Sequence, residues 1–338
     1  MTSNYPEPLI IPSLRSHQYT FLLLHGRGSN AGKFGPTLLS SPVARGDMSP
    51  ECTLISAFPH ARFVFPTASK CRATVYKRSI INQWFDNWTL GTDTPETPQE
   101  KQQREYLQID GLRETSLYLH ELLKYEISLV GGNAKRIFFG GLSQGCAASL
   151  VALLQWDGDP LGAAIGMCGW LPFREQMEAI ARGMDDIEGS DEVDGEDFNP
   201  FGDPGEDEGD SHDVSSPLNS TPADRAVIFL KDQLEMPLPR HLSGSLAFQR
   251  TPLFLGHGVE DEKVPVGLGR EAASCLGAMG MDVAWNEYKG LGHWYSENML
   301  SDLVNFLRQI EPQLEILPVE KSVIAAPSLF DRTQHTYI

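Results

Sequence analysis

Residues 136–148 read RIFFGGLSQGCAA, an apolar strand that stops at a glycine-flanked serine and continues into small residues typical of a helix. Gly141 and Gly145 flank Ser143 in the spacing G-x-S-x-G. A sharp strand-to-helix turn leaves no room for a Cβ atom at the flanking positions, and it lifts the serine Oγ above the sheet edge. This context favours a nucleophile elbow over a chance glycine-serine loop, and it predicts a hydrolase with Ser143 as the nucleophile.

A carboxylate and an imidazole must follow the serine, because a hydroxyl is a weak nucleophile at neutral pH and this fold orders its triad Ser, Asp, His. A buried strand expected at 252–257 leads into a loop that carries three neighbouring acids. Asp261 is the predicted acid of the triad. Glu260 and Glu262 remain competitors, and a solvated loop carboxylate is the ordinary alternative for each of the three.

The base must be one of nine histidines, although a lone histidine is more often structural than catalytic. His293 is the predicted base, because it lies in a glycine loop that follows a strand expected at 283–288. His25 and His257 also follow apolar strands. His25 precedes the serine and His257 precedes the acid, so neither fits the expected order.

The oxyanion of an acyl-transfer intermediate needs backbone donors, and the loop HGRGS at 25–29 follows an apolar strand where this fold supplies one. The predicted donors are the backbone N–H groups of Arg27 and of Gln144, the residue after the nucleophile. Fixed dipoles of this kind stabilise the developing charge, and losing one typically costs about 2.7 to 4 kcal/mol of transition-state stabilisation.

A dinucleotide-binding fingerprint is the alternative interpretation of the same glycine loop. The match is weak, because the third glycine is one residue late, at Gly32, and residues 33–36 show no clear helix opening on the loop. We therefore expect neither a nicotinamide nor a flavin cofactor.

Seven separate blocks between about residues 18 and 310 form a more specific pattern: LHGxG at 24–28, PxA at 66–68, WFD at 84–86, GLSQG at 141–145, GWLP at 169–172, HGxxDxxVP at 257–265, and His293. Together they resemble the acyl-protein thioesterase, or phospholipase/carboxylesterase, branch of the α/β-hydrolases. The resemblance implies a triad of Ser143, Asp261 and His293, an oxyanion hole from the amides of Arg27 and Gln144, and an acyl groove lined by Trp84, Phe85, Trp170 and Leu171. From the residues alone, the aromatics at 84–88 fit ordinary core positions equally well.

Three positions depart from that family pattern. Arg27 stands where the family usually has a small apolar residue and Ser29 where it usually has Asp, so we expect a more polar entrance and the acyl preference stays open. Cys146 stands where glycine or alanine is common, and it is expected to pack as a small hydrophobe.

Strands and helices alternate along the chain, which predicts an α/β-hydrolase fold with a mostly parallel central sheet flanked by helices. Strands are expected near 19–25, 62–66, 135–140, 163–168, 252–257 and 283–288, and helices near 101–128, 144–155, 173–183, 266–280 and 297–310. We expect one domain over residues 1–315 and a loose tail over 316–338.

An acidic insertion is predicted at 184–247. Of the formal net charge of −18, fourteen negative charges lie in 185–213, which has no Lys or Arg, so the remaining chain carries −4. Such a segment buries too little apolar surface to offset its ordering entropy, and we expect it to be largely disordered. A helix over 223–231 and a role as a lid are possible exceptions; a tolerated surface insertion is the simpler interpretation.

Composition indicates in which cellular compartment the protein works and which classes of partner it binds. Five cysteines without metal-like spacing argue against a disulfide framework and a zinc site, and they favour a reducing, cytoplasmic location. The start has no signal-peptide pattern, and no stretch approaches the roughly 18 apolar residues of a membrane span. The negative charge disfavours nucleic acid and anionic membrane surfaces as partners. No metal or organic cofactor is expected.

The predicted activity is two-step acyl transfer, in which His293 takes the Ser143 proton and Asp261 orients the imidazolium. By resemblance, the substrates are long-chain thioesters on protein cysteines, as in protein depalmitoylation, or lysophospholipid-like esters. Small carboxylic esters are the close alternative. An inactive hydrolase fold that binds partners through the acidic insertion is the remaining one.

Overall fold

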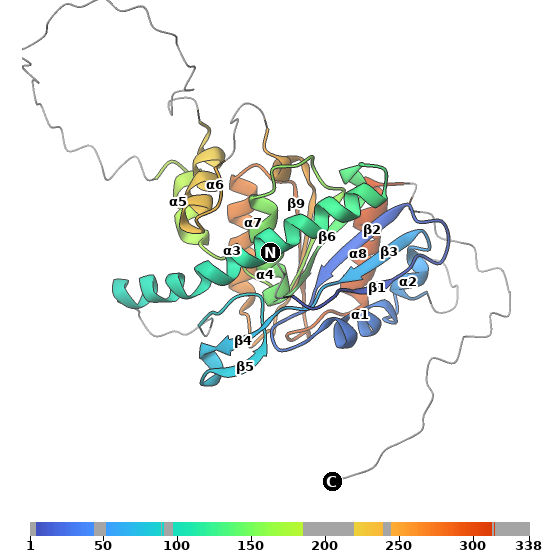
Figure 1. Cartoon of the computed structure of the whole chain (residues 1–338), viewed down its shortest axis with the longest axis horizontal. Coiled ribbons are helices and arrows are strands. Elements are labelled where there is room, and N and C mark those ends of the chain that lie inside the picture. The colour runs from blue at the N-terminus through green and yellow to red at the C-terminus, as the bar shows by residue number, and fades with distance from the viewer. Residues whose placement is uncertain are drawn as a thin grey trace, which may run out of the picture.

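A seven-stranded sheet forms the centre of the molecule in the computed structural model, which describes residues 5–43, 52–88, 90, 97–184, 220–238, 245–312 and 314 (Figure 1). The strand order is β1-β3-β2-β6-β7-β8-β9. All neighbours pair in parallel except β1 and β3. The strands are β1 (Leu9–Ile11), β2 (Tyr19–Leu24), β3 (Ala61–Phe65), β6 (Ile137–Leu142), β7 (Ala163–Met167), β8 (Leu253–Gly258) and β9 (Val283–Tyr288).

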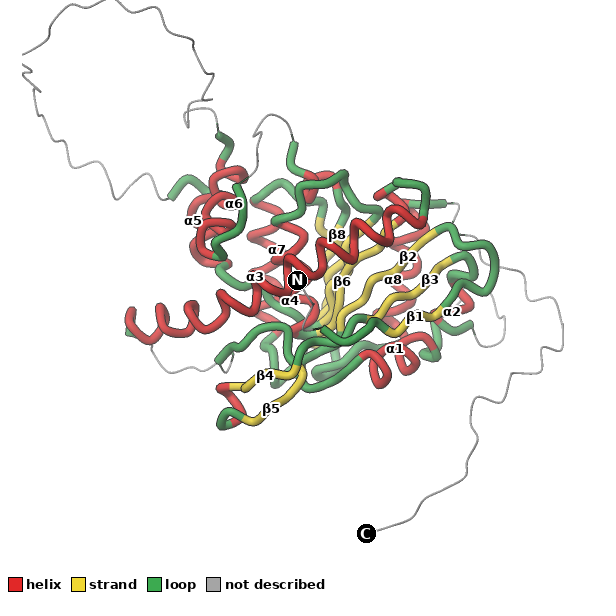
Figure 2. The backbone as a smooth tube through the Cα atoms, viewed as in Figure 1, coloured by secondary structure: helices red, strands yellow, loops and turns green. Residues whose placement is uncertain are grey.

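Helices cover both faces of this sheet, as the tube in Figure 2 shows. One face packs against α1 (Ala31–Leu39), α2 (Leu54–Ala57) and α8 (Glu297–Ile310). The other packs against α3 (Pro98–Leu129), α4 (Gln144–Leu154) and α7 (Val266–Ala278), with α5 (Arg174–Ala181) and α6 (Pro222–Gln233) beyond them. The predicted mostly parallel sheet flanked by helices is confirmed.

The pleat of β2 shows how one strand serves two cores. Leu22 and Leu24 belong to the core beneath α3 and α4, whereas Phe21 and Leu23 belong to the core beneath α1 and α8. Successive side chains of a strand point to opposite faces, so a strand between two helical layers is apolar at nearly every position; Thr20 is the polar exception in β2. This is why β2 and β6 appear in the sequence as continuous apolar runs.

The sequence predicted no helix directly after the loop that follows β2, and this prediction is wrong: α1 begins there. Helix α1 begins after Asn30, whose side chain accepts a hydrogen bond from the amide of Lys33, and it contains Pro36. Its glycines and proline lower helix propensity. Burial of Phe34 and Leu38 against the sheet outweighs that cost, because packing decides most helices in proteins.

A small hairpin, absent from the predicted elements, projects beside the sheet (Figure 1). It consists of β4 (Lys70–Ala73) and β5 (Ser79–Asn82), paired antiparallel, with a 3₁₀ turn at 74–76 between them. The carboxylate of Asp86 accepts hydrogen bonds from the amide and the hydroxyl of Thr74, at 2.9 and 2.5 Å, and so fixes the turn.

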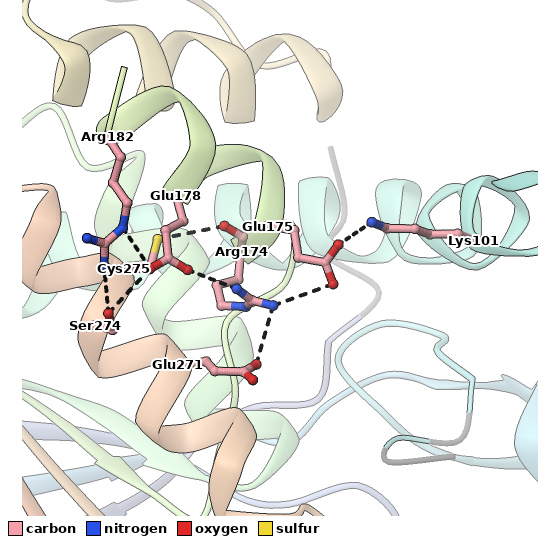
Figure 3. Close-up of polar contacts among 8 residues, drawn as sticks. All are labelled: Lys101, Arg174, Glu175, Glu178, Arg182, Glu271, Ser274 and Cys275. Carbon is pink, nitrogen blue, oxygen red and sulfur yellow. Dashed lines mark hydrogen bonds and ion pairs between the residues drawn. The ribbon is translucent and has the colours of Figure 1, made fainter. Parts of the chain in front are cut away.

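Charged side chains join α5 to α7 and α3 on the outer layer (Figure 3). Arg174 pairs with Glu178 at 2.8 Å and with Glu271 of α7 at 3.3 Å. Glu178 also pairs with Arg182, and Glu175 pairs with Lys101 of α3. The network fixes α5, the last element described before residue 185, on the body of the fold.

Helix α6 lies within the predicted insertion and packs against α5. It extends the helix expected at 223–231 by one or two residues at each end. Its Lys231 is only 2% exposed and pairs with Asp157 at 2.7 Å. Most of the segment expected to be disordered, namely 185–219 and 239–244, lies outside the described residues, as does the tail expected at 316–338.

Candidate active site

Ser143 sits at the carboxyl edge of the sheet, directly between β6 and α4, with φ 57° and ψ −122°. A positive φ is strained for any residue with a Cβ atom, and such strain concentrates at functional sites. The turn requires its glycines, because a Cβ on Gly141 would lie 2.7 Å from the carbonyl oxygen of Leu24. The close approach of β2 to the turn therefore excludes a side chain there.

Three side chains predicted from distant positions meet at this edge. The Oγ atom of Ser143 lies 2.9 Å from Nε2 of His293, and Nδ1 of His293 lies 2.7 Å from Oδ2 of Asp261. The strands before these residues, β6, β8 and β9, are parallel, so their carboxyl ends share one edge. The hydroxyl, the imidazole and the carboxylate thus form one hydrogen-bonded chain, the arrangement that activates a serine nucleophile.

Burial separates Asp261 from its acidic neighbours. Glu260 and Glu262 are exposed, whereas the carboxylate of Asp261 is fully buried. Burial by itself would raise the pKa of Asp261, but hydrogen bonds from His257, His293 and the amide of Val264 outweigh it and hold the pKa well below its usual value. Asp261 therefore stays ionised beside the imidazole.

His25 is a structural residue of the loop after β2. Its Nδ1–H donates to the carbonyl of Gly26 at 2.7 Å, and its Nε2 accepts from the amide of Ala68 at 3.1 Å. Burial lowers the pKa of His25 to about 4, so the ring is neutral near pH 7. It holds the loop that presents Arg27.

The two predicted oxyanion donors lie beside the nucleophile. Arg27 and Gln144 line the same cavity as Ser143. The amide of Arg27 has no hydrogen-bond partner within the described part of the chain. Gln144 is the first residue of α4, where an N–H group lacks an intrahelical acceptor. Both amides are therefore available to an oxygen atom in the cavity.

The side chain of Gln144 is hydrogen-bonded to residues of the WFD block and to Asn87, which follows it. Its Oε1 accepts from the amide of Trp84 at 3.1 Å, and its Nε2 donates to the carbonyl of Phe85 at 2.7 Å and to Oδ1 of Asn87 at 3.1 Å. The indole of Trp84 donates to the carbonyl of His25 at 2.7 Å. This block therefore joins the loop after β2 to the start of α4.

A cavity of about 350 Å³ opens over Ser143 and His293. Trp170 lines it, together with Leu90, and both also line a second cavity of about 180 Å³ that includes Leu171. The predicted groove role of Trp84 and Phe85 is corrected: each is 1% exposed and lines neither cavity. The hydrogen bonds to His25 and Gln144 keep both residues behind the wall.

Two residues beside the site could not be identified from the sequence, Tyr76 in the cavity over Ser143 and Asn87 in the adjoining cavity. Asn87 accepts hydrogen bonds from Gln144 and from the side chain of Arg27, 60 residues away. Tyr76, from the hairpin turn, lies against the guanidinium of Arg27 with its ring centroid 5.2 Å away. Nothing in the local pattern around either residue indicates a partner so distant in the chain.

The described residues contain neither a metal-binding cluster nor a membrane-spanning helix. Among the described residues, no group of three or more His, Cys, Asp or Glu side chains is arranged to hold a metal ion. Within the same residues, no helix has the length and apolar character needed to cross a membrane.

Comparison of the sequence with protein families gives one match that spans most of the chain. The family described as phospholipase/carboxylesterase matches residues 6–187 and 233–311. The interruption falls within the predicted insertion.

Known proteins of similar sequence carry related names. Acyl-protein thioesterase 1 of Gibberella zeae is 24% identical over 312 residues, which cover 92% of this chain and 99% of that protein. Acyl-protein thioesterase 1 of Emericella nidulans is 24% identical over 306 residues, covering 90% and 95%.

Solved structures share the fold. Zea mays acyl-protein thioesterase 2 superposes with a TM-score of 0.54 at 19% identity, covering 90% of this chain and 99% of that one. Esterase PE8 superposes with a TM-score of 0.53 at 18% identity, covering 90% and 98%. The predicted fold class is confirmed.

Proposed function

This chain belongs to the phospholipase/carboxylesterase family of hydrolases, and we propose that it cleaves acyl thioesters and esters with Ser143, His293 and Asp261 as its catalytic triad. The observation that carries the proposal is the position of His293. Its Nε2 lies 2.9 Å from Oγ of Ser143, and its Nδ1 lies 2.7 Å from Oδ2 of Asp261. A single imidazole placed between a hydroxyl and a buried carboxylate has the geometry of a general base.

The first half of the reaction forms an acyl-enzyme. Nε2 of His293 takes the proton of Ser143 as Oγ attacks the carbonyl carbon, and the same proton passes to the departing thiolate or alkoxide. The ionised Asp261 fixes the tautomer of His293 and stabilises the imidazolium. In the second half, His293 takes a proton from water, the hydroxide attacks the acyl-enzyme, and Oγ recovers a proton on release of the carboxylic acid.

The oxyanion of both tetrahedral intermediates is assigned to the amides of Arg27 and Gln144. Support comes from their place beside Ser143 and from the rigid setting of each amide. His25 holds the first loop, and the side-chain hydrogen bonds of Gln144 hold the second. Donors fixed in advance need no reorganisation when charge develops, which is the source of their catalytic effect.

The proposed path of the acyl chain runs from Ser143 past Trp170 and Leu90. Both residues line the cavity over the serine and the adjoining cavity that includes Leu171. The adjoining cavity also contains charged residues of α3 and α5, among them Arg104 and Glu105, but its apolar side continues from Trp170 to Leu171 and Phe173. That side extends beyond what an acetyl group requires, which favours a long acyl chain. On this basis we place the enzyme closest to acyl-protein thioesterases, with S-acylated proteins in the cytoplasm as its substrates.

A fluorophosphonate probe tests the catalytic assignment. The folded protein should be labelled at one serine, and Ser143→Ala should abolish the labelling. Ser16→Ala is the matched control, since Ser16 is exposed and belongs to neither cavity. An unlabelled wild-type protein with a normal circular dichroism spectrum would refute the proposal and favour an inactive fold.

A second assay separates the substrate classes. Turnover of an S-palmitoylated peptide is measured in competition with a lysophospholipid and with p-nitrophenyl acetate. The proposal expects the palmitoylated peptide to be preferred, and Trp170→Ala should weaken that preference. A rate that falls steadily as p-nitrophenyl esters lengthen beyond acetate would instead identify a small-ester hydrolase, the alternative that the polar Arg27 at the entrance favours.

A further inference from the structure

Arg27 places a positive charge in the wall of the catalytic cavity. Arg27 is partly buried and lines the cavity together with Ser143 and His293. The backbone of Arg27 was assigned above to the oxyanion, a role that any residue except proline can fill. The guanidinium is a separate feature of this wall, and Arg27 as a whole is only partly removed from water.

The guanidinium is held by neutral partners. Nη1 donates to Oδ1 of Asn87 at 2.7 Å, and the ring of Tyr76 lies under it at 5.2 Å. Asn87 is itself fixed, because it is 3% exposed, its Oδ1 also accepts from Gln144, and its Nδ2 donates to the carbonyl of Trp88 at 2.9 Å. These contacts orient the guanidinium and leave its charge uncompensated.

No carboxylate compensates that charge among the described residues. Arg27 forms no ion pair there, whereas Arg62, Arg174 and Arg270 each pair with a glutamate at 3.0 Å or less. Only Nη1 of the five-donor guanidinium has a hydrogen-bond acceptor in the described part of the chain. The remaining donors are those that bind a carboxylate or a phosphate in a two-point contact.

Charged residues also lie near Arg27. The cavity wall also contains Lys263 and Glu262, adjacent residues of opposite charge. The hairpin that contributes Tyr76 carries four basic residues and no acidic one between residues 70 and 82, namely Lys70, Arg72, Lys77 and Arg78. Of the hairpin, only Val75 and Tyr76 line the cavity, so these basic residues lie on the element beside it, whose turn also contacts the carboxylate of Asp86.

We propose that the guanidinium of Arg27 is a specificity-determining group that binds an anionic oxygen group, a carboxylate or a phosphate, carried by the substrate close to the scissile carbonyl. The inference rests on the proposed hydrolase function and adds the substrate class: acidic esters and thioesters are cleaved in preference to neutral ones of the same size. Asn87 and Tyr76 position the guanidinium and do not contact the reacting atoms.

Matched pairs of substrates test this. In the leaving group, S-butanoyl-3-mercaptopropionate and S-butanoyl-2-mercaptoethyl phosphate are compared with the neutral amide S-butanoyl-3-mercaptopropionamide, with release of thiol as the readout. In the acyl group, mono-p-nitrophenyl glutarate is compared with p-nitrophenyl glutaramate. Uncatalysed hydrolysis is subtracted from every rate, and the measured quantity is the ratio of charged to neutral kcat/KM.

The ratio of charged to neutral kcat/KM is compared between the wild type and three variants. Arg27→Gln should lower it about tenfold in at least one pair, since a hydrogen bond to a charged group typically contributes that much. Arg27→Lys keeps the charge and should retain most of the preference. Arg15→Gln removes the same charge from an exposed site before β2, at the opposite edge of the sheet, and should leave the ratio unchanged. The pair that responds most identifies carboxylate or phosphate as the anion.

An unchanged ratio in Arg27→Gln for every pair, or an equal fall in Arg15→Gln, would overturn the inference while leaving the hydrolase function intact. Absence of turnover with all esters would instead refute the proposed function. Binding then decides the inference separately: the charged thioesters are titrated calorimetrically into Ser143→Ala and into Ser143→Ala/Arg27→Gln. The second protein should bind them about tenfold more weakly, and equal affinity would overturn the inference.

Discussion

A Cβ atom added to Gly145 would lie 2.6 Å from the carbonyl oxygen of His25. The obstruction is backbone, so no rotation of a side chain can relieve it. Gly145→Ala should therefore lower the free energy of unfolding by about 1 to 3 kcal/mol, the usual range for overpacking. Urea denaturation followed by circular dichroism measures this, and a variant as stable as the wild type would show that the β2 loop can move away.

Gly267, in the first turn of α7, is the matched control for that substitution. No atom lies within 4 Å of the position that its Cβ would take. Gly267→Ala should leave the protein as stable or raise the free energy of unfolding by up to about 1 kcal/mol, because alanine loses less backbone entropy in a helix.

Asp261→Asn should lower kcat by about four orders of magnitude, the loss found when the acid of a serine-protease triad is replaced by its amide. KM should change much less, since the carboxylate contacts His293 and does not line the cavity. Steady-state kinetics with a short p-nitrophenyl ester measures both. Glu260→Gln, an exposed neighbour, should keep wild-type kinetics; a comparable loss there would reassign the acid.

Stability should fall as the pH decreases from about 6.5 to 4, partly through His25. Its pKa in the folded state is lowered to about 4, so over this window the unfolded chain binds a proton that the folded chain does not. Linkage then gives a loss of about 2 kcal/mol at pH 4.5 relative to pH 7. Urea denaturation at several pH values gives the free energy of unfolding as a function of pH. Between pH 7 and pH 4.5 this free energy should fall less in His25→Gln than in the wild type, whatever the variant's stability at pH 7. Parallel curves would contradict the assignment.

The ion pair of Lys231 and Asp157 should respond unequally to the removal of each partner. Lys231 is buried, whereas the side chain of Asp157 is 62% exposed. Asp157→Asn leaves the buried ammonium group of Lys231 without an opposite charge. It should lower the free energy of unfolding by about 1 to 2 kcal/mol, a value reduced for the solvent exposure of the carboxylate. Lys231→Met removes the buried charge and should cost less. In the Lys231→Met background, Asp157→Asn should have almost no further effect on the unfolding free energy.

The long parallel strands and their helices were predictable, because burial on both faces makes strands such as β2 continuous apolar runs. Helix α1 was not, since Gly35 and Pro36 lower its propensity and only the packing of Phe34 against the sheet selects it. The β4–β5 hairpin escaped prediction for a similar reason. Its residues are partly exposed and charged, and the hydrogen bonds of Asp86 to Thr74 fix a turn that lacks a turn-forming pair.

At the site, the order of residues along the chain was enough to name the three side chains that the structure brings together. The sequence left three acids open at 260–262, and burial of one carboxylate is what distinguishes Asp261. The WFD block shows the opposite limit. The family resemblance implied a groove role for Trp84, but its partners, His25 and Gln144, are too far along the chain for any local pattern to reveal.

The packing of α5 against α6 brings residue 184, where the description stops, and residue 220, where it resumes, back to one helical layer. The polypeptide thus leaves and re-enters the body on the same side, away from the sheet that supports Ser143. Such a junction suits protein engineering: a reporter domain whose own termini are close together can be spliced in place of 185–219 without stretching either helix.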